Sequence, residues 1–471
     1  MAFFSAIHHM RLASRLVPRG ALAAVAAAQL HGWSDKGGVR LDAGAEDRPA
    51  FWEKRQGEHA YLEDVLGEQA MAWVKTENER TVEKLGDPTA KPLYGRLLSI
   101  LESKEKIPHL TKRGDYYYNF WQDAANPRGL LRRTTLEAFE AAGASGGALA
   151  WETVLDVDAL GKAEGVSWVY SGLRTLADGS PHCENRVLLL LSRGGADAVV
   201  VREFNLASKA FVAPASGGFA VPHEGKVRVE WKDKDTLLLG TVVGGDADRD
   251  LTDSGYPRTV REWRRGGRLE DAPVVFEGDK RDVSVQGGMG RHRGWAFEQR
   301  VRATSFYTYE YSLRCAEAPA GASTSGGGER GGGGGEEFTS LRLVLPPDAS
   351  LSTFAGQAIV SLKATPWAGH APGTLVAVDA RALITAAARA NANATGASGS
   401  SGSSGGGGGE AAFGALAATV LFKPSPRCSL AGWTRTKDYL IVSSLVIKAP
   451  RETSLVAARI CVCILAVDCY S

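Results

Sequence analysis

Residues 115–135 read DYYYNFWQDAANPRGLLRRTT, and this stretch predicts a β-hairpin more clearly than any other part of the chain. Its first run is rich in Tyr, Phe and Trp, which favour a pleated, half-buried surface. The segment Asn126-Pro127-Arg128-Gly129 suits a tight turn, because Pro127 fits the first central position and Gly129 tolerates positive φ. We therefore expect a packed hairpin whose inward side chains are Tyr116, Tyr118, Phe120 and Leu130.

Similar signals recur throughout residues 106–445. In VLLLLSRGGADAVVVREFNL (187–206), Gly194-Gly195 separates two apolar runs, a pattern typical of a hairpin. Further strands, each bounded by Gly, Pro, Asp or Ser, are expected at VRVEW (227–231), TLLLGTVV (236–243), RTVREW (258–263), PVVFEG (273–278), FYTYEYSL (306–313), LRLVLP (341–346), AIVSLKA (358–364), TLVAVDA (374–380), TVLFKP (419–424) and DYLIVSS (438–444). Because almost no helix is expected between them, this region predicts an all-β repeat architecture.

Residues 50–105 have a helical pattern instead. Apolar side chains recur at helical spacing in two groups, which Gly86-Asp87-Pro88 separates. The first group is Leu62, Val65, Leu66, Ala70, Trp73 and Val74, and the second is Leu93, Leu97, Leu98 and Leu101. A short helical segment should therefore precede the strands.

The N-terminal residues 1–49 have the composition of an organellar transit peptide. The first 34 residues contain no acidic side chain, carry Arg11, Arg15 and Arg19, and include an alanine-rich run at 21–28. A secretory signal and a disordered extension are the alternatives, and a mitochondrion or plastid is favoured over the cytoplasm. No run of eighteen or more apolar residues occurs anywhere in the sequence.

Two low-complexity stretches interrupt the strand region, at 317–337 and 391–410. Both are dominated by Gly and Ser, so we expect disordered loops between strands. The final residues, 446–471, form a divergent tail.

The charge balance excludes one broad class of partner. The chain has 55 Lys and Arg against 53 Asp and Glu, a net charge of +2, so nothing favours nucleic acid or an anionic membrane. The basic run Arg258–Arg268, RTVREWRRGGR, is interpreted as a strand with a solvated face. Six cysteines favour a reducing compartment, and Cys461, Cys463 and Cys469 lack a second ligand pair, so no metal site is expected.

Several segments together resemble the prolyl oligopeptidase family of serine peptidases. The hairpin with its flanks KIPHLTKRG (106–114) and WETVLDVDAL (151–160) is similar to the start of that family's β-propeller domain. Residues 61–80, YLEDVLGEQAMAWVKTENER, resemble its leading helix, although Tyr61 stands where a Trp is expected. The resemblance covers about residues 61–444 and continues, in the family's order, through 191–212, 231–240, 251–266, 346–354, 372–383 and 426–443.

The resemblance implies a β-propeller, seven-bladed in the family. Outside the low-complexity stretches, about 300 residues at roughly 45 to 50 per four-stranded blade give about six blades, an incomplete ring. In the family the leading helical segment packs on a C-terminal hydrolase domain that carries the catalytic Ser, Asp and His, and this chain is expected to stop before that domain.

Two functions follow as hypotheses. The first is a truncated prolyl-oligopeptidase-like protein, inactive alone, that retains the substrate-gating propeller of a serine endopeptidase acting on short proline-containing peptides. The alternative is a non-catalytic propeller that acts as a protein-interaction module. Neither hypothesis requires a cofactor, a nucleic acid or a membrane, and the implied ligands are short peptides.

The sequence offers no convincing catalytic residue. The family's nucleophile lies in a Gly-x-Ser-x-Gly turn between a strand and a helix, and this pattern occurs at GASGG (143–147) and GSSGG (402–406). Ser145 is expected in an Ala/Gly loop and Ser404 lies within a Gly/Ser tract, so we interpret both as compositional matches.

The histidines and the remaining motif are interpreted in the same way. His182, His223, His292 and His370 are expected in turns or on surfaces of the strand region, and His182-Cys183 is interpreted as a turn rather than a catalytic pair. GGMGRHRG (287–294) is expected to be a glycine-rich loop without the strand-loop-helix setting of a phosphate site. We assign no catalytic, cofactor-binding or metal-binding residue.

Overall fold

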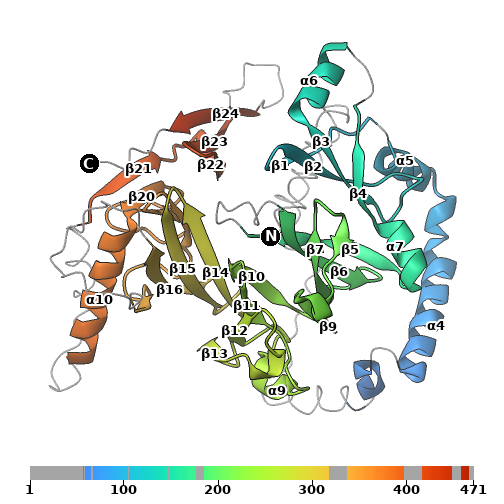
Figure 1. The fold of residues 1–471 in the computed structure, drawn as a ribbon, viewed down its shortest axis with the longest axis horizontal. Coiled ribbons are helices and arrows are strands. Elements are labelled where there is room, and N and C mark those ends of the chain that lie inside the picture. Colours follow the sequence, from blue (N-terminus) through green and yellow to red (C-terminus); the bar gives the residue numbers. More distant parts are fainter. Residues whose placement is uncertain are drawn as a thin grey trace, which may run out of the picture. The chain divides into compact units, whose positions relative to one another are not determined.

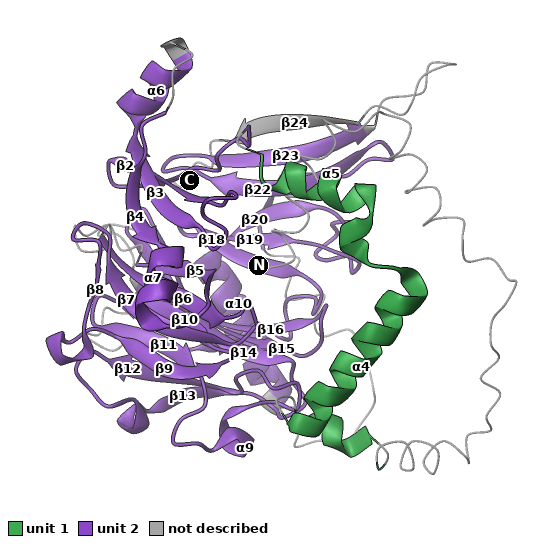
Figure 2. Cartoon of the chain, turned by 90° about the vertical axis from the view of Figure 1, so that its right-hand side faces the viewer, with its two compact units in different colours: residues 1–103, 450–455 green, residues 104–449, 456–471 purple. Residues whose placement is uncertain are grey.

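The computed structural model describes residues 57, 59–64, 67–103, 105–145, 149–176, 185–317, 337–396, 416–447 and 458–465, the last range by its backbone. The chain divides into two compact units, residues 1–103 with 450–455, and residues 104–449 with 456–471. Figure 2 colours the helical unit green and the strand-rich unit purple.

The first unit contains two α-helices, as predicted. They are α4 (Glu68–Leu85) and α5 (Pro92–Leu101), accompanied by the short 3-10 turns η1 (Ala60–Glu63) and η2 (Pro88–Ala90). Gly86 ends α4 at φ 81°, and its N–H donates to Val82 O at 2.7 Å. The Asp87 carboxylate then accepts from Thr89 N at 2.8 Å, which caps η2. Leu62 lies in η1 rather than in the helix, and Val65 and Leu66 lie outside the described residues.

The second unit contains six antiparallel sheets among the described residues, each built from strands that are consecutive in sequence. They follow one another along the colour gradient of Figure 1. Sheet 1 is β1 (Thr111–Arg113), β2 (Tyr116–Trp121), β3 (Leu130–Thr135) and β4 (Glu152–Asp156); sheet 2 is β5 (Trp168–Thr175), β6 (Arg186–Arg193), β7 (Val199–Asn205), β8 (Ala210–Phe211) and β9 (Ala220–Gly225); sheet 3 is β10 (Arg228–Asp233), β11 (Thr236–Gly240), β12 (Thr259–Arg264) and β13 (Val274–Glu277). Sheet 4 is β14 (Ser284–His292), β15 (Trp295–Ala303), β16 (Tyr309–Glu317) and β17 (Thr339–Ser340); sheet 5 is β18 (Ser350–Phe354), β19 (Gln357–Ser361), β20 (Leu375–Asp379) and β21 (Ala418–Phe422); sheet 6 is β22 (Cys428–Arg435), β23 (Leu440–Ile447) and β24 (Ala458–Leu465). This repetition of consecutive antiparallel sheets is the blade pattern of a β-propeller, which confirms the predicted fold class.

The core lies between the sheets. Each pair of consecutive sheets shares a cluster of buried apolar side chains, so five clusters join the six sheets. Strand β6 shows how one strand serves two clusters: Leu189 faces the cluster shared with sheet 1, and Leu188 faces the cluster shared with sheet 3. Both leucines are fully buried, which explains why its sequence is continuously apolar instead of alternating.

The predicted hairpin at residues 115–135 is present, but its turn differs from the prediction. Strands β2 and β3 pair from Tyr116↔Thr135 to Trp121↔Leu130, so the connection is a loop of residues 122–129. The Asp123 side chain organises that loop by accepting from Asn126 N at 2.9 Å and from Trp121 Nε1 at 3.0 Å. Gly129 does have positive φ, 101°. The buried leucine of β3 is Leu131, at 3% exposure, and not Leu130, because the loop sets the register.

The glycine-rich segment 287–294 is mostly strand and not a loop. Residues 284–292 form β14, and only Arg293 and Gly294 make the turn to β15. A Cβ on Gly287 would lie 3.1 Å from side-chain atoms of Leu238 and Val260 in sheet 3. A Cβ on Gly290 would lie 2.2 Å from Thr353 Oγ1 in sheet 5. These glycines therefore allow β14 to pack closely between its neighbours.

The expectation of almost no helix between strands was wrong. Helices α6 (Leu136–Ser145), α7 (Val157–Glu164), α9 (Ala247–Asp250) and α10 (Ala380–Gly396) follow strands or connect them. Residues 391–396 belong to α10, and the Asn391 side chain donates to Ser340 O at 2.9 Å, so the start of the predicted disordered loop is ordered. Residue 317 ends β16, whereas 318–336 and 397–415 lie outside the described residues.

The segment LRLVLP (341–346) is not a strand either. Leu341 and Val344 are buried in the cluster between sheets 4 and 5, but the backbone turns, with Leu345 N donating to Leu341 O at 2.9 Å. Among the described helices, none is long and apolar enough to cross a membrane.

Candidate functional site

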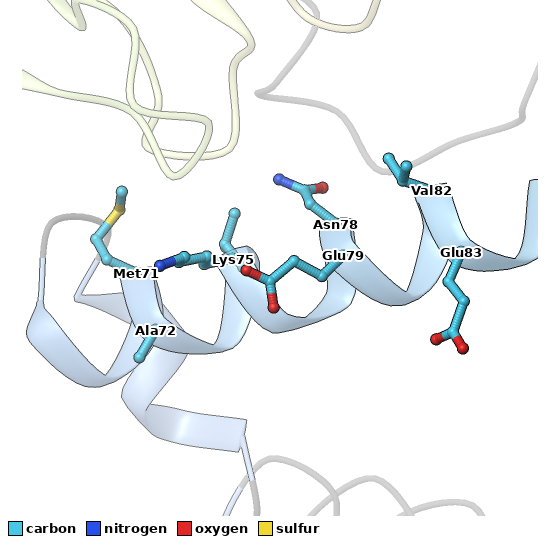
Figure 3. Close-up of a pocket in the computed structure, with 8 residues that line it drawn as sticks. Met71, Ala72, Lys75, Asn78, Glu79, Val82 and Glu83 are labelled. Carbon is cyan, nitrogen blue, oxygen red and sulfur yellow. The ribbon is translucent and has the colours of Figure 1, made fainter. Parts of the chain in front are cut away.

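A shallow, open surface hollow lies along helix α4. All the residues that line it belong to α4, and Figure 3 shows Met71, Asn78 and Val82 on one side of that helix. Several large apolar side chains of this unit are exposed, including Met71 at 49% and Leu85 at 69%. The same holds for Leu93, Leu97 and Leu101 of α5. The two helices present apolar surface without forming a site for a small molecule.

The two Gly-x-Ser-x-Gly matches do not show the arrangement of a hydrolase nucleophile. Ser145 is the last residue of α6, so a helix precedes it, whereas the nucleophile turn requires a strand before the serine and a helix after it. The prediction of an Ala/Gly loop at Ser145 was therefore wrong for residues 143–145. Ser404 and His182-Cys183 lie outside the described residues.

Three of the four singled-out histidines are described, and they lie apart in the sheet unit. His223 is an exposed residue of β9, and His370 lies in a turn where its N–H and carbonyl pair with Trp367. His292 ends β14 and stacks on Phe354 with ring centroids 4.3 Å apart.

His292 is the most constrained of these residues. Its Nε2 lies 3.2 Å from Thr436 O in the β22–β23 turn, and its Nδ1 is buried without a hydrogen-bond partner. Burial lowers the pKa of His292 below its usual value, and nearby Arg435 and Arg293 add to this effect. The adjacent Arg293 pairs with Asp438 at 2.7 Å, so this region joins sheets 4 and 6.

The first strands of the sheets carry the charged residues that sequence analysis missed. Strand β10 contacts β5 and β14, and β14 contacts β18, so the first strands of sheets 2 to 5 lie side by side. Along β10 the residues alternate: Val229 and Trp231 are buried, whereas Arg228, Glu230 and Lys232 are partly exposed. We call Arg174, Arg228, Glu230, Lys232 and Arg291 the inner-strand charged surface.

One part of this surface is an ion network around Glu298 of β15. The Glu298 side chain is fully buried, and its Oε2 accepts from Arg314 Nη2 at 2.6 Å. Lys232 Nζ lies 3.7 Å from the same oxygen and also pairs with Glu262 of β12. This network ties four strands of sheets 3 and 4 together, β10, β12, β15 and β16, and two cations neutralise its buried carboxylate.

The other part joins sheets 2 and 3. Arg174 Nε of β5 lies 3.0 Å from Glu230 Oε1 of β10, and Trp231 Nε1 donates to Arg174 O at 3.2 Å. Burial raises the pKa of Glu230, and the Arg174 charge opposes that rise. Next to this pair, Arg228 lies with its guanidinium carbon 5.0 Å from the centre of the Tyr256 ring.

The basic run 258–268 forms strand β12 and a turn, as predicted, and Arg264 and Arg268 are exposed, but Arg261 and Arg265 do not lie on a solvated face. Arg261 is buried, with Nη1 donating to Ala272 O at 2.8 Å and Nη2 lying 3.3 Å from Asp250 Oδ1. Arg265 pairs with the fully buried Glu203 of sheet 2 at 2.7 Å. These arginines are structural because their partners are buried carboxylates within the blades.

Metal binding finds no support in the described part of the chain, where no group of three or more His, Cys, Asp or Glu side chains could hold an ion. Cys461 and Cys463 lie in β24, for which only the backbone is described, and Cys469 lies outside the described residues.

Comparison with known proteins decides the family. Residues 48–295, more than half of the chain, match the model for the N-terminal β-propeller domain of prolyl oligopeptidase. The chain belongs to the prolyl oligopeptidase family. It is 33% identical over 397 residues to the uncharacterized peptidase y4nA of Sinorhizobium fredii, covering 82% of this chain and 46% of the relative. It is 31% identical over 239 residues to the uncharacterized peptidase RP174 of Rickettsia prowazekii, covering 48% of this chain and 31% of the relative.

Solved structures of this family have the same fold. A post-proline cleaving enzyme from Rickettsia typhi aligns with a TM-score of 0.62 at 22% identity, covering 86% of this chain and 54% of that one. A structure from a study of two prolyl endopeptidases aligns with a TM-score of 0.52 at 14% identity, covering 82% of this chain and 47% of that one. The chain thus spans about half the length of these relatives or less.

Proposed function

We propose that this chain supplies the substrate-gating propeller of a serine peptidase that acts on short proline-containing peptides. The observation that carries the proposal is the run of six consecutive antiparallel sheets in a chain that belongs to the prolyl oligopeptidase family. In a propeller, the sheets surround a central channel. The side-by-side first strands β5, β10, β14 and β18 would line that channel, and its width would limit the size of an entering peptide.

The proposal includes inactivity of the 471 residues by themselves. Activating a serine needs a histidine within hydrogen-bond reach and donors aimed at the oxyanion. Ser145 at the end of α6 and His292, enclosed between Phe354 and Thr436, have unsuitable settings for these roles. The catalytic residues would belong to a hydrolase domain, and the exposed apolar side chains of α4 and α5 would pack on it.

The test is a set of three proteins: the 471-residue chain, the part of the S. fredii relative that this chain does not cover, which would be the hydrolase part, and a fusion of the two. We expect that the chain neither cleaves a proline-containing fluorogenic pentapeptide nor reacts with a fluorophosphonate probe. The fusion should cleave the pentapeptide but spare the same sequence within a folded protein. Cleavage by the chain alone, or equal cleavage of both substrates by a folded fusion, would contradict the proposal.

A second function, a protein-interaction module, rests on the β15–β16 turn. Phe306 and Tyr307 are 79% and 82% exposed there. Ser305 Oγ accepts from the backbone N–H groups of Tyr307 and Thr308, each at 3.1 Å, which fixes the turn. Exposed aromatic side chains on a rigid turn suit protein binding. If this is the function, a protein partner captured by the unchanged chain should no longer bind the double variant Phe306→Ser and Tyr307→Ser. Unaltered binding of that partner by the double variant would exclude this turn as the interaction site.

A further inference from the structure

Among the described residues, Arg228 differs from Arg174 and Arg291 of the inner-strand charged surface because its guanidinium has neither an ion pair nor a hydrogen bond, whereas Arg174 pairs with a carboxylate and Arg291 donates to Lys232 O. Among the described residues, no carboxylate lies within ion-pair distance of its guanidinium, and its buried Nε has no hydrogen-bond partner. Arg174, by comparison, pairs with Glu230 at 3.0 Å. An arginine that is partly removed from water and left without a carboxylate costs free energy, so a fold-only role does not explain it.

The surroundings of Arg228 hold it in place without occupying its N–H groups. Two cations lie near the Tyr256 ring, whose centre is 4.2 Å from Lys226 Nζ and 5.0 Å from the guanidinium carbon of Arg228. Lys226 has its own partner, Asp197 at 3.5 Å, and Tyr256 OH also donates to Asp197, at 3.4 Å. A cation–π contact takes up no N–H donor, and although Nε of Arg228 is buried, its two Nη groups are not buried and have no described hydrogen-bond partner, so they can donate to a ligand.

The local charge therefore favours an anion. The Arg174–Glu230 and Lys226–Asp197 pairs are each neutral, which leaves the one positive charge of Arg228 uncompensated. Burial lowers the pKa of Arg228, and the nearby Arg174 charge acts in the same direction, whereas Tyr256 opposes the shift. A guanidinium binds a carboxylate through two parallel hydrogen bonds, a geometry that lysine cannot offer.

We propose that Arg228 binds the C-terminal carboxylate of a short peptide and so orients the peptide within the propeller. This inference rests on the proposed function, because Arg228 lies on β10, one of the strands assigned to the channel. A peptide in a longer protein has no free carboxylate near its cleavage site, so this contact would add a chemical preference for short substrates to the steric limit.

The binding experiment uses the 471-residue chain and one proline-containing pentapeptide with a dye on its N-terminus. The peptide is prepared as the free acid and as the C-terminal amide, and the Kd of each is measured by fluorescence anisotropy. We expect the acid to bind about ten-fold more tightly than the amide, equivalent to about 1.4 kcal/mol. Arg228→Gln should remove this preference, and Arg228→Lys should restore only part of it because lysine lacks the planar fork.

Arg264→Gln is the matched control, because Arg264 is an exposed residue of the same sheet and the change removes the same charge. This variant should keep the preference for the acid. Arg228→Gln should melt no lower than the unchanged chain, since the Arg228 side chain makes no hydrogen bond to a described residue and its charge repels that of Arg174. A lower melting temperature would show a structural role and would contradict the proposal.

Three further outcomes of the binding experiment would overturn the assignment of Arg228. Equal Kd values for acid and amide, or a preference that survives in a folded Arg228→Gln variant, would overturn the assignment. Binding of acetate without binding of either peptide would also overturn it and would indicate a simple anion site. Because binding is measured on the chain alone and cleavage on the fusion, failure of this inference is distinguishable from failure of the proposed function.

Discussion

The helical unit and the sheet unit use their apolar side chains in opposite ways. In the sheets, leucines such as Leu189 and Leu237 are fully buried between consecutive blades. In α4 and α5, Leu85, Leu97 and Leu101 are between half and seven-tenths exposed, and Ala70 is the buried residue of α4. The sheets are therefore stabilised by one another, whereas the helices carry apolar surface suited to a further partner.

The largest expected difference in stability is between two variants that each replace a leucine by aspartate, one in the sheet unit and one in the helical unit. Leu189→Asp puts an unpaired carboxylate between sheets 1 and 2, and we expect it to cost more than about 4 kcal/mol, enough to prevent folding. Leu97→Asp, at a side chain 51% exposed, should cost less than about 1 kcal/mol. Urea unfolding of the two variants measures the difference. Equal losses of stability would contradict the conclusion that the sheets bury their apolar side chains whereas the helices expose theirs.

A smaller effect is expected within the sheet unit at the hairpin of sheet 1. Phe120 stacks on Tyr170 of sheet 2 with ring centroids 4.3 Å apart, so Phe120→Asp should cost about 2 to 4 kcal/mol. The control is Phe306→Asp at the exposed β15–β16 turn, which should change stability by less than about 0.5 kcal/mol. Thermal melting compares them, and a normal melting temperature for Phe120→Asp would show that sheet 1 does not pack on sheet 2.

Arg133 provides a weaker, polar link between the same two sheets. It pairs with Glu152 through two N–O contacts of 2.6 and 3.2 Å and donates to Leu206 O at 3.1 Å. Arg133→Met should therefore cost about 1 to 3 kcal/mol, because the buried Leu206 carbonyl loses a donor. Unfolding at pH 7 measures this loss, and a variant as stable as the unchanged chain would exclude the link.

The same pair predicts a pH dependence. The hydrogen bond from Arg133 is the main cause that lowers the pKa of Glu152 to about 2, and Lys209 adds to it. A carboxyl whose pKa falls on folding stabilises the folded state above its unfolded pKa, near 4.5, and this contribution is lost as the pH falls toward 2. Glu152→Gln should flatten the decline of stability in this window only slightly, because Glu152 is partly exposed.

The sequence predicted those parts of the fold that depend on local pattern. The apolar run of β6, the Gly194-Gly195 turn and the break at Gly86-Asp87-Pro88 specify their structures through side-chain spacing and backbone freedom. Strand β14 was missed because its glycines, Gly287 and Gly290, are explained by close contacts with sheets 3 and 5, which are distant in sequence. LRLVLP has the composition of a strand, but its side chains reach the core from a turn.

The candidate site was harder to predict for the same reason. Strands β5 and β10 have no sequence motif that marks Arg174, Arg228 and Glu230 as a site. These residues come close together only when sheets 2 and 3 pack against each other. Alternation along VRVEW could have separated Arg228 and Glu230 from the buried Val229 and Trp231. It could not have shown that Glu230 pairs with Arg174 and leaves Arg228 unmatched.

Hydrogen exchange tests the contrast between the two units most directly. We predict that amides of α5 in the 471-residue chain exchange at least about 100-fold faster than those in the interior of β6 and of β11, because α5 has no buried side chain and the interior residues of the two strands are buried. In the fusion with the hydrolase part, protection of α5 should rise while that of β6 stays the same. Strong protection of α5 in the chain alone, or no gain in the fusion, would contradict the proposal that the sheets stabilise one another whereas the leading helices pack on a hydrolase domain.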